Sequence, residues 1–411
     1  MPGAEAMSFD DAYTGFLTHL SPIPGRAGDP EVSFWGGIVP PWGPRDRELS
    51  LGGAGWTDDD ARDACVGEAI ERFQAYALPA DEIVESSCAD WPLDEPAVGP
   101  EGWVLFHPDQ YRSRLFPFAP FSRDTRCRWV CFREAGTGSP RWIPEEFGFL
   151  FHAAGDRPRI SPAYSTGLSC GRSGHPILLR GLQEAIERDG ILGAWWGAYG
   201  IEEWSAAAVF GELDPSLPPR FRRPNRRYRF YRVKSPFSDH VTIATVEGED
   251  RDGFVFAAGS SCRESRPASW AKSLLEALQG AAYVRQLRAD RGGLDWVDTL
   301  TDYAHHAAYY AAHPAKLDDT VLLHAGPPTG GASPAETMSV LRERLGPARP
   351  VLFRNLTPPA IAQEHADWIV LRVVVPGLQP LHGNHAWPHL GGPLWRGPLD
   401  DWRSTQPHPF A

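Results

Sequence analysis

The chain has 411 residues and a formal net charge of −12, with 42% hydrophobic and 22% charged residues. This composition predicts a packed globular interior, and the acidic balance argues against nucleic acid and anionic membranes as partners. No apolar run reaches the length of a membrane span, and the N-terminal residues MPGAEAMSFDD lack the pattern of a secretion signal.

Predicted strands and helices alternate along most of the chain. Residues 1–45, rich in Pro, Gly and Asp, are expected to form an irregular lead-in, and residues 46–411 one folded domain. Runs rich in Val, Ile and Phe predict strands at RWVCF, HVTIATV, GFVFAA, TVLLHA, PVLFRNL and WIVLRVVV. Amphipathic patterns predict helices over 58–75, 174–189, 269–289 and 334–345. This mixture predicts an α/β or α+β fold.

The six cysteines, at 65, 88, 127, 131, 170 and 262, form no CxxC pair. Cys127 and Cys131 would point to one face of a strand, so zinc is an alternative to ordinary buried thiols. Because no secretion signal is present, free thiols in a reducing compartment are the better interpretation, and we expect a cytoplasmic protein.

Three segments follow one template, and the stretch EAIER occurs twice, at 68–72 and 184–188. In each segment a Gly/Ser-rich stretch, expected to be a loop, precedes an amphipathic helix. Each helix carries an acidic residue and a second acceptor three positions later, so that the two side chains lie next to each other. The candidate caps are Thr57, Ser173 and Ser269. The paired positions are Glu68 with Glu71, Glu184 with Glu187, and Glu276 with Gln279.

Neighbouring carboxylates repel each other, which a solvated helix face tolerates at small cost. A solvated face is therefore the alternative for any single copy, but three copies behind glycine-rich stretches favour a compensating cation. Mg²⁺ fits, because it takes a few carboxylate ligands and shares its other positions with phosphate and water. Arg180, Arg188 and Lys272 would then face phosphate oxygens, provided that the three helices converge in space.

These segments resemble the YcaO-domain family. STGLSCGRS…LLRGLQEAIERDG is similar to the family's central glycine-rich and ERD segment, GGAGWTDDDARDACVGEAIERF to its first ATP-site helix, and WAKSLLEALQG to the third. RWVCFREAGTGSPRWIP and the tract from LFRNLTPPAIAQ to WIVLRVVVPGLQPL also fit, so the resemblance runs from about Leu51 to the C-terminus. It implies several sheets flanked by amphipathic helices that carry an acidic ATP and Mg²⁺ site, and chemistry on a peptide backbone amide.

The resemblance also implies roles for individual residues. The metal ions would be bound by Glu71, Glu187 and Glu276. The nucleotide would be bound by Glu68, Glu184, Gln279, Arg180, Arg188 and Arg372.

The C-terminal tail PHPFA resembles the proline-rich end of family members that make azoline rings, in which the terminus reaches the active site. On this basis the catalytic candidates are Pro407, Pro409 and Ala411. From the residues alone, two prolines at alternating positions stiffen an extended tail, and a disordered end is the alternative.

Several positions depart from the family's pattern. Ala54 stands where a lysine is usual, and Ala64 replaces the serine four positions before the first glutamate. Ala281 stands in place of an arginine after the third motif, with Arg285 four residues later, and the final residue is Ala411, not proline.

The resemblance leads to three hypotheses for function. In the first, an ATP-dependent cyclodehydratase phosphorylates a backbone amide oxygen of a ribosomal precursor peptide, and a Cys, Ser or Thr side chain closes a thiazoline or oxazoline ring. In the second, sulfide is the nucleophile and a thioamide forms. In the third, motivated by Ala54 and Ala64, the chain is a degenerate, non-catalytic scaffold subunit.

Expected partners follow from the first hypothesis. No extra domain large enough to grip a leader peptide precedes the matching region, so we expect a separate leader-binding partner of the E1-like or clasp type. A flavin-dependent azoline dehydrogenase that aromatises the rings is a further expected partner.

Histidines also gather outside these motifs. The segment LHGNHAWPHLGG contains His382, His385 and His389, for which zinc is the alternative to loop positions or substrate contacts. The segment YAHHAAYYAAH, on a predicted helix, is better explained by packing or solvation than by a site.

Overall fold

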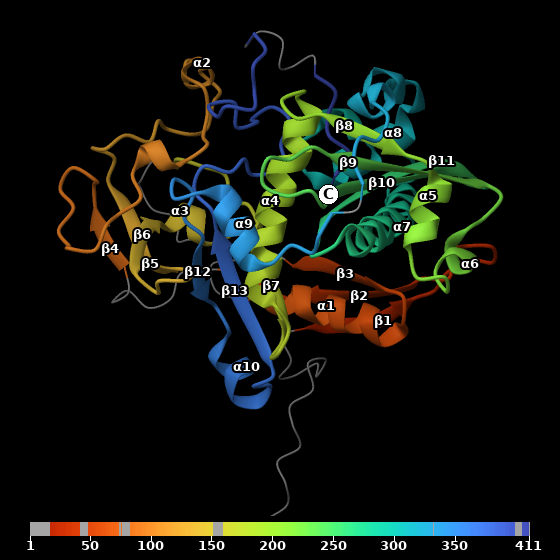
Figure 1. Cartoon of the computed structure of the whole chain (residues 1–411), viewed down its shortest axis with the longest axis horizontal. Helices are drawn as coiled ribbons and strands as arrows, with labels where there is room; N and C mark the ends of the chain where they lie inside the picture. The colour runs from red at the N-terminus through yellow and green to blue at the C-terminus, as the bar shows by residue number, and fades with distance from the viewer. Residues whose placement is uncertain are drawn as a thin grey trace, which may run out of the picture.

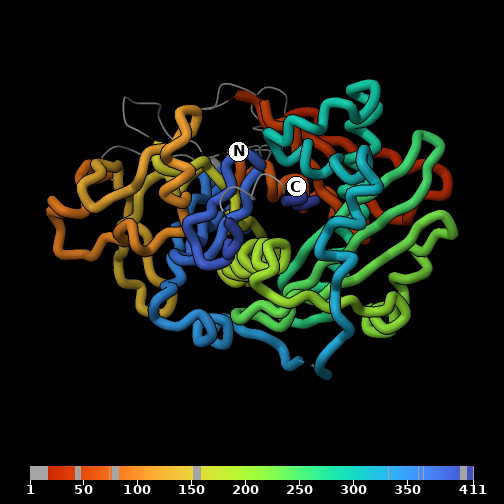
Figure 2. The backbone as a smooth tube through the Cα atoms, turned by 90° about the horizontal axis from the view of Figure 1, so that it is seen from above, coloured from red at the N-terminus to blue at the C-terminus, as the bar shows by residue number. Residues whose placement is uncertain are grey.

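The computed structural model describes residues 17–41, 48–73, 75, 83–150, 159–331, 333–398 and 405–410. Within these residues the strands form three antiparallel sheets, and the helix α4 (Ile177–Trp195) lies between two of them (Figure 1). Figure 2 shows the same helix from above, near the middle of the molecule. The predicted mixed α/β class, with several sheets and flanking helices, is confirmed.

The first sheet contains β1 (Thr18–Ile23), β2 (Ser33–Val39) and β3 (Leu49–Gly55), in that order. Helix α1 (Asp58–Phe73) packs against β2 and β3. The prediction of an irregular lead-in over residues 1–45 is therefore wrong for β1 and β2. Several of its prolines and glycines lie in the turn between these strands, whereas β2 has aromatic and β-branched residues that suit a sheet.

The second sheet has the order β4-β5-β12-β13-β7, and β6 also pairs with β5. Its strands are β4 (Ile83–Ser86), β5 (Cys127–Glu134), β6 (Pro140–Pro144), β7 (Leu168–Arg172), β12 (Leu352–Asn355) and β13 (Trp368–Val374). Segments far apart in the sequence therefore lie side by side. In this register Arg372 on β13 is opposite Leu168, at the start of the strand that leads into α4.

The third sheet has the order β11-β10-β9-β8. Its strands are β8 (Ile201–Trp204), β9 (Arg226–Val233), β10 (Val241–Asp250) and β11 (Gly253–Cys262). Because side chains alternate along a strand, both faces of the sheet are buried. Phe230 and Ala244 pack with α7 (Arg266–Asp290), whereas Tyr231 and Ile243 pack in the core around α4 and α8 (Tyr303–Ala312).

Shorter helices connect these sheets. They are α2 (Pro108–Tyr111), α3 (Glu145–Gly148), α5 (Ala206–Glu212), α6 (Pro218–Phe221), α9 (Met338–Leu345) and α10 (Pro359–Glu364). Single 3₁₀ turns cover Pro100–Gly102, Val297–Thr299, Pro314–Asp319 and Val321–His324. No helix in the described part of the chain is both long and apolar enough to cross a membrane.

The sequence predicted the four longer helical regions to within a few residues of α1, α4, α7 and α9, apart from the end of α4, which extends to Trp195. One predicted strand is wrong, because TVLLHA forms the 3₁₀ turn Val321–His324. Leu322 is buried in the core around α4, whereas Leu323 is exposed. Packing of single side chains therefore explains this apolar run without strand pairing.

Candidate active site

Glycines in β3 and β11 allow the helices that follow, α1 and α7, to pack closely against these strands. A Cβ atom at Gly53 of β3 would lie 2.2 Å from the backbone oxygen of Ala61 in α1. A Cβ atom at Gly259 of β11 would lie 2.3 Å from the backbone oxygen of Ser273 in α7. The prediction that these stretches are loops is wrong: GGAG lies in β3, GLSCGR largely in β7 and AAGSSC in β11. Their glycines permit close strand–helix packing and do not form an anion-binding loop.

The helix caps are confirmed in one case out of three. Thr57 accepts a hydrogen bond from the backbone N–H of Asp60, at 3.1 Å. Ser173 is not a cap, because α4 begins after Pro176. Ser269 lies inside α7, whose cap is Ser265, and its hydroxyl accepts a hydrogen bond from the backbone N–H of Arg263.

The acidic faces of α1 and α4 meet at Glu71 and Glu184. Both side chains are partly buried. Burial raises the pKa of Glu71 to about 8, with Arg72 opposing the effect and Glu184 and Glu68 adding to it. The Glu71 carboxylate also accepts a hydrogen bond from the backbone N–H of Cys170 on β7.

Glu184 experiences the same crowding from the side of α4. Burial raises its pKa to about 7, and the carboxylate of Glu187 adds to this, while Arg188, Arg72 and Arg372 oppose it. Without a cation, these glutamates therefore titrate near neutral pH. Carboxylates in this condition gain from a bound divalent ion, which favours their ionised form.

Glu187 is buried and fully engaged by donors. Its Oε1 atom accepts a hydrogen bond from the hydroxyl of Ser260 at 2.6 Å, and its Oε2 atom accepts one from the backbone N–H of Cys262 at 3.1 Å. The guanidinium of Arg188 lies 3.4 Å from Oε1. Glu187 is thus fixed in orientation by β11, as a positioned ligand requires.

Arg188 connects α4 with α7. Its guanidinium lies 3.9 Å from Glu184 and donates a hydrogen bond to the hydroxyl of Ser260 at 3.4 Å. Burial alone would lower the pKa of Arg188, but the carboxylates of Glu187, Glu184 and Glu276 outweigh it and raise the pKa. Glu276 on α7 therefore interacts electrostatically with Arg188 on α4.

The third contact joins α7 to α1 through the edge of β3. Gln279 donates a hydrogen bond from its Nε2 atom to the backbone oxygen of Gly52, at 3.2 Å. The backbone N–H of Gly52 donates to Oε2 of Glu68, at 3.4 Å. Gly52 thus links the paired positions of the first and third helices.

All six paired positions consequently lie in one connected region, which we call the acidic cluster. It comprises Glu68, Glu71, Glu184, Glu187, Glu276 and Gln279. The convergence on which the sequence argument depended is therefore present. Arg188 and Arg372 border the cluster.

Two other predicted cations have protein partners. The guanidinium of Arg180 binds both carboxylate oxygens of Glu264, at 2.6 and 2.8 Å, and Oε1 of Gln183 at 2.8 Å. Within the described residues, the hydrogen bonds and ion pairs of Arg180 do not reach the acidic cluster. Lys272 lies 3.2 Å from Glu276, so it neutralises part of the cluster itself.

Arg372 is a buried cation with spare donors. It is 1% exposed, and its Nη2 atom donates to the backbone oxygens of Phe147 and Tyr164, at 3.0 and 3.1 Å. Its Nε and Nη1 atoms have no hydrogen-bond partner in the described part of the chain. Burial lowers the pKa of Arg372, while Tyr164 and Glu184 act in the opposite direction. A buried guanidinium with unused N–H groups beside an acidic cluster suits a phosphate group.

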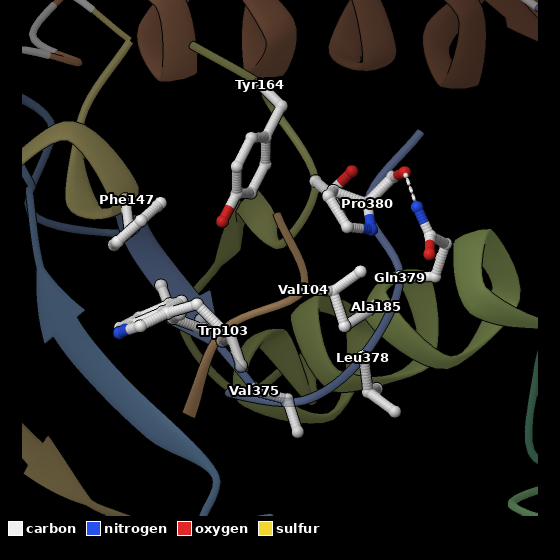
Figure 3. Close-up of a pocket in the computed structure, with 12 residues that line it drawn as sticks. Trp103, Val104, Phe147, Tyr164, Ala185, Val375, Leu378, Gln379 and Pro380 are labelled. Atoms are coloured by element: carbon white, nitrogen blue, oxygen red, sulfur yellow. Dashed lines mark hydrogen bonds between the residues drawn. The ribbon is translucent and has the colours of Figure 1, made fainter. Parts of the chain in front are cut away.

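A pocket lies on the side of α4 next to these residues. Figure 3 shows Trp103, Phe147 and Tyr164 on one side of it and Gln379 and Pro380 on the other. The cavity measures about 30 Å³, which is room for a water molecule or two. It is too small for a nucleotide base.

Three residues of this region were missed by the sequence reasoning. Arg72 follows Glu71 directly and acts on both Glu71 and Glu184. Burial is the main cause of the raised pKa of Tyr303 on α8, and the charges of Arg188, Arg72 and Glu184 also act on it. For Tyr303 the local sequence carried no signal, because its helix was assigned to packing.

The third missed residue is Asp189, the last letter of the ERD triplet. Its carboxylate accepts hydrogen bonds from the backbone N–H of Gln379 and the hydroxyl of Tyr199, both at 2.9 Å. Burial raises the pKa of Asp189 to about 6. The acidic helix is thus attached to the segment that follows β13.

The C-terminal tail is packed into the molecule. Pro407 and Pro409 are buried, and Phe410 is 2% exposed in the core around α4. The charge of Arg188 reaches His408 in the tail. Ala411 lies outside the described residues. The alternative of a disordered end does not hold for residues 405–410.

Metal-binding geometry is absent from the described residues as they stand. No group of three or more His, Cys, Asp or Glu side chains there is arranged to hold a metal ion, which argues against zinc at Cys127 and Cys131 or at His382, His385 and His389. The acidic cluster, too, does not have three carboxylates already arranged around one position. Mg²⁺ commonly binds proteins through one or two carboxylates and completes its shell with phosphate and water, so the cluster fits this ion together with a nucleotide.

Comparison with known proteins identifies the family. A sequence model described as YcaO cyclodehydratase, ATP- and Mg²⁺-binding, matches residues 52–379. ATP and Mg²⁺ are thus the ligands of the matching family, as the resemblance predicted. No curated protein sequence matches the chain.

The fold is similar to three solved structures. A heterocyclase in complex with substrate and cofactor matches with a TM-score of 0.71 and 17% identity, over 97% of this chain and 55% of that one. YcaO from Methanopyrus kandleri, bound with AMPPCP and Mg²⁺, matches with a TM-score of 0.55 and 19% identity, over 88% and 86% of the two chains. The E. coli microcin synthetase McbBCD complex matches with a TM-score of 0.63 and 14% identity, over 98% and 99%. This chain therefore spans about half the length of the first heterocyclase.

Proposed function

This chain belongs to the YcaO family, and from that premise we propose that it is the ATP-dependent cyclodehydratase subunit of a system that modifies a ribosomal precursor peptide. Its substrates are Cys, Ser or Thr residues of the peptide, and its products are thiazoline or oxazoline rings. The observation that carries the proposal is the convergence of α1, α4 and α7 in one acidic cluster beside a buried, spare-donor arginine.

The proposed reaction removes one water molecule per ring. The side-chain sulfur or oxygen of the substrate attacks the preceding carbonyl carbon, and the resulting oxyanion accepts the terminal phosphoryl group of ATP. Expulsion of phosphate with the amide oxygen, together with loss of the amide N–H proton to solvent, then leaves the C=N bond of the ring. The amide oxygen alone is a poor leaving group, and phosphorylation makes it a good one.

Each residue of the cluster has a proposed task. Glu71, Glu187 and Glu276 would bind Mg²⁺, which when bound offsets the negative charge of the phosphates. The nucleotide would be held by Glu68, Glu184, Gln279, Arg188 and Arg372. Arg188 and Arg372 would offset the charge that develops on the transferred phosphoryl group. Arg180 remains a nucleotide candidate only if it exchanges Glu264 for phosphate.

The tail supplies the remaining proposed groups. Pro407 and Pro409 keep residues 405–410 extended in the interior, near Arg188. We propose that the terminal carboxylate, at Ala411, accepts the proton of the attacking Cys, Ser or Thr side chain. A packed proline-containing tail supports ring formation over thioamide formation, which we keep as the second candidate.

The scaffold alternative also has support in the structure. Ala54 is buried in β3, where it offers no cation to a phosphate. Arg285 binds Asp29 at 2.6 and 2.9 Å, so it does not take the place of the arginine missing at Ala281. Both observations remove expected nucleotide contacts, while the acidic cluster is complete.

We further propose a multi-protein setting in the cytoplasm. One similar solved structure is the E. coli microcin synthetase McbBCD complex. By analogy, a leader-binding partner of the E1-like or clasp type would present the precursor peptide to this chain, and a flavin-dependent azoline dehydrogenase would act on the rings. All six cysteines are free thiols, in keeping with a reducing compartment.

Two measurements test the proposal. Calorimetry of the purified chain with ATP and Mg²⁺ should show binding that is lost in Glu187→Gln and kept in Glu343→Gln, an exposed position on α9. Phosphate release with precursor peptide and leader-binding partner should accompany the loss of one water mass per ring. Absence of phosphate release with all components present would leave the scaffold, and exchange of oxygen for sulfur would indicate the thioamide reaction.

A further inference from the structure

The C-terminal tail is held by side chains that donate to its carbonyl groups. Because proline has no N–H, a tail with two prolines offers mainly acceptors to its surroundings. Trp195 donates to the backbone oxygen of Gln406 at 2.7 Å, and Tyr310 donates to that of Pro407 at 2.6 Å. Side chains with N–H or O–H donors therefore hold the tail.

Four imidazoles complete this arrangement, and we call them the histidine cluster. They are His306 on α8, His382 and His385 after β13, and His408 in the tail. The rings of His306 and His408 stack with centroids 4.0 Å apart, and the His382 ring lies 4.8 Å from that of His408. His306, His382 and His408 are each less than 5% exposed.

Carbonyl groups fix which ring nitrogens carry protons. Nδ1 of His306 donates to the backbone oxygen of His408 at 2.8 Å, and Nε2 of His408 donates to that of His382 at 2.8 Å. Nε2 of His385 donates to the backbone oxygen of Thr405 at 3.2 Å. Within the described residues, Nε2 of His306 and Nδ1 of His408 have no hydrogen-bond partner. A second proton on either ring would therefore find no acceptor in the described part of the chain.

The stacked geometry excludes a shared metal ion as the cluster stands. Lone pairs of two nearly parallel rings, 15° apart, lie in separate planes and do not converge on one ion. The described residues also contain no group of three or more ligands arranged around a metal. The rings are better understood as neutral packing and donor groups.

The charges around the cluster oppose protonation. Arg188 on α4 lowers the pKa of His408, as do the rings of His306 and His385. The rings of His306, His385 and His408 lower the pKa of His382, and that of His385 lowers the pKa of His306. On α8, His305 also lowers the pKa of His306. Asp302 and the hydrogen bond to the backbone oxygen of His408 act in the opposite direction, and Asp302 is itself hydrogen-bonded to His305 at 2.7 Å. Asp319 faces the tail as well, at 3.4 Å from the side-chain amide of Gln406. The facing tyrosines are Tyr303 and Tyr310, and His389 lies near His382.

Burial is the largest effect on every member of the cluster. It lowers the pKa of His306 to about 3, and it lowers the pKa of His382, His385 and His408 below the ordinary value. Since the pKa of an undocked histidine is about 6.5, the docked tail is favoured above that pH. Its stability is lost progressively as pH falls below 6.5.

We propose that the histidine cluster is a positioning site that docks the C-terminal tail beside the acidic cluster only while its imidazoles are neutral, and that mild acid releases the tail. The docking itself is independent of the proposed function. Its catalytic consequence rests on that function, because it concerns the terminus that would serve there as base.

Carboxypeptidase Y digestion of the full chain tests the docking without any substrate. Loss of Phe410, followed by intact mass, should be slow at pH 7.0 and faster at pH 5.5. A free peptide of residues 402–411 corrects for the enzyme's own pH dependence. Each histidine that protonates on release should lower the docking constant on the order of tenfold at pH 5.5.

Variants separate titration from packing. His306→Asn and His408→Gln keep an amide donor at the position of the donating ring nitrogen but do not titrate. Because His382 and His385 still titrate, the double variant should be released by acid less steeply than wild type. His306→Ala should be digested at pH 7.0, whereas His313→Ala, at the end of the same helix and partly exposed, should behave as wild type. A wild-type rate that does not change with pH after correction, or a double variant released as steeply by acid as wild type, would overturn the proposal.

Labelling of the unmodified protein gives a second readout that needs no variant. Diethyl pyrocarbonate should modify His313 but spare His306 and His408 at pH 7.0. Equal labelling of all three would show that the tail is not docked. Because neither experiment involves ATP turnover, loss of the proposed enzymatic activity would not affect their outcome.

Discussion

The acidic cluster and the histidine cluster both gather ionisable groups of one kind beside α4, but they differ in exposure and in charge. Most members of the acidic cluster are partly open to solvent, whereas His306, His382 and His408 are almost completely buried. Crowded carboxylates at a partly open position can be stabilised by a cation from solution. Crowded imidazoles in the interior have no such ligand within reach and persist because they can be neutral. The difference shows how exposure decides whether like groups become a binding site or a packing element.

The largest expected effect comes from the most firmly fixed carboxylate. Glu187→Gln removes the charge that Ser260, Cys262 and Arg188 orient, so peptide-dependent phosphate release should fall by about 10²–10³-fold. Tail digestion at pH 7.0 should not change, because the hydrogen bonds and ion pair of Glu187 in the described part of the chain go to Ser260, Cys262 and Arg188 and not to the histidine cluster. If release of the tail changed together with activity, the two clusters would not be separate units. Thermal melting checks that the variant is folded.

A second change should separate stability from function within the acidic cluster. Because the pKa of Glu71 is raised to about 8, its carboxyl group is largely protonated at pH 7 without a cation, and Glu71→Gln resembles that state. We expect a melting temperature without Mg²⁺ equal to or above that of wild type. The affinity for ATP with Mg²⁺ should fall by about 10–100-fold, measured by calorimetry. A lower melting temperature with unchanged affinity would contradict the assignment of Glu71 as a ligand.

Two arginines near α4 provide a matched pair for the nucleotide contact. Arg372→Met removes the buried guanidinium with unused donors and should weaken ATP binding by about tenfold. Arg180→Met removes a guanidinium already bound to Glu264, and its effect should stay within about twofold. Calorimetric titration with ATP and Mg²⁺ measures both. Equal effects of the two substitutions would mean that Arg180 exchanges its partner for phosphate.

The acidic cluster should also show a pH dependence that the histidine cluster does not share. Glu71 and Glu184, with pKa values of about 8 and 7, must lose protons to bind a cation, so affinity for Mg²⁺ with ATP should rise from pH 6 to pH 8. The rise should approach tenfold per pH unit at most for each proton released. Calorimetry in buffers of different ionisation enthalpy would count these protons. No proton release at pH 7 would show that the carboxylates are ionised before the metal binds.

The sequence predicted the acidic cluster because its information is local. An acidic residue and an acceptor three positions later share a helix face wherever the helix lies, so Glu68 with Glu71 and Glu184 with Glu187 could be paired without coordinates. Spacing alone could not show that the three helices converge, and only the family resemblance implied a shared site. The glycine-rich stretches were misread as loops, since a glycine that admits a helix backbone looks the same in sequence as a glycine in a turn.

The histidine cluster could not be predicted, because its members come from three distant segments. His306 lies on α8, His382 follows β13, and His408 follows a further stretch near the terminus. Local patterns assign each of them a separate and ordinary role. Only the packing of residues 405–410 against α4 and α8 brings the rings together, and no periodicity in the sequence encodes that packing. The strand β2 was missed for a different reason, because the prolines and glycines around it made the whole segment look irregular.

Asp189 ties the acidic helix to a segment that is synthesised much later. Its two hydrogen-bond donors are Tyr199, which emerges from the ribosome soon after it, and Gln379, which emerges much later. Until Gln379 has been translated, a nascent chain therefore holds the Asp189 carboxylate through Tyr199 without the second donor. The attachment of α4 to the segment after β13 is thus completed only after all three acidic helices, α1, α4 and α7, have been translated.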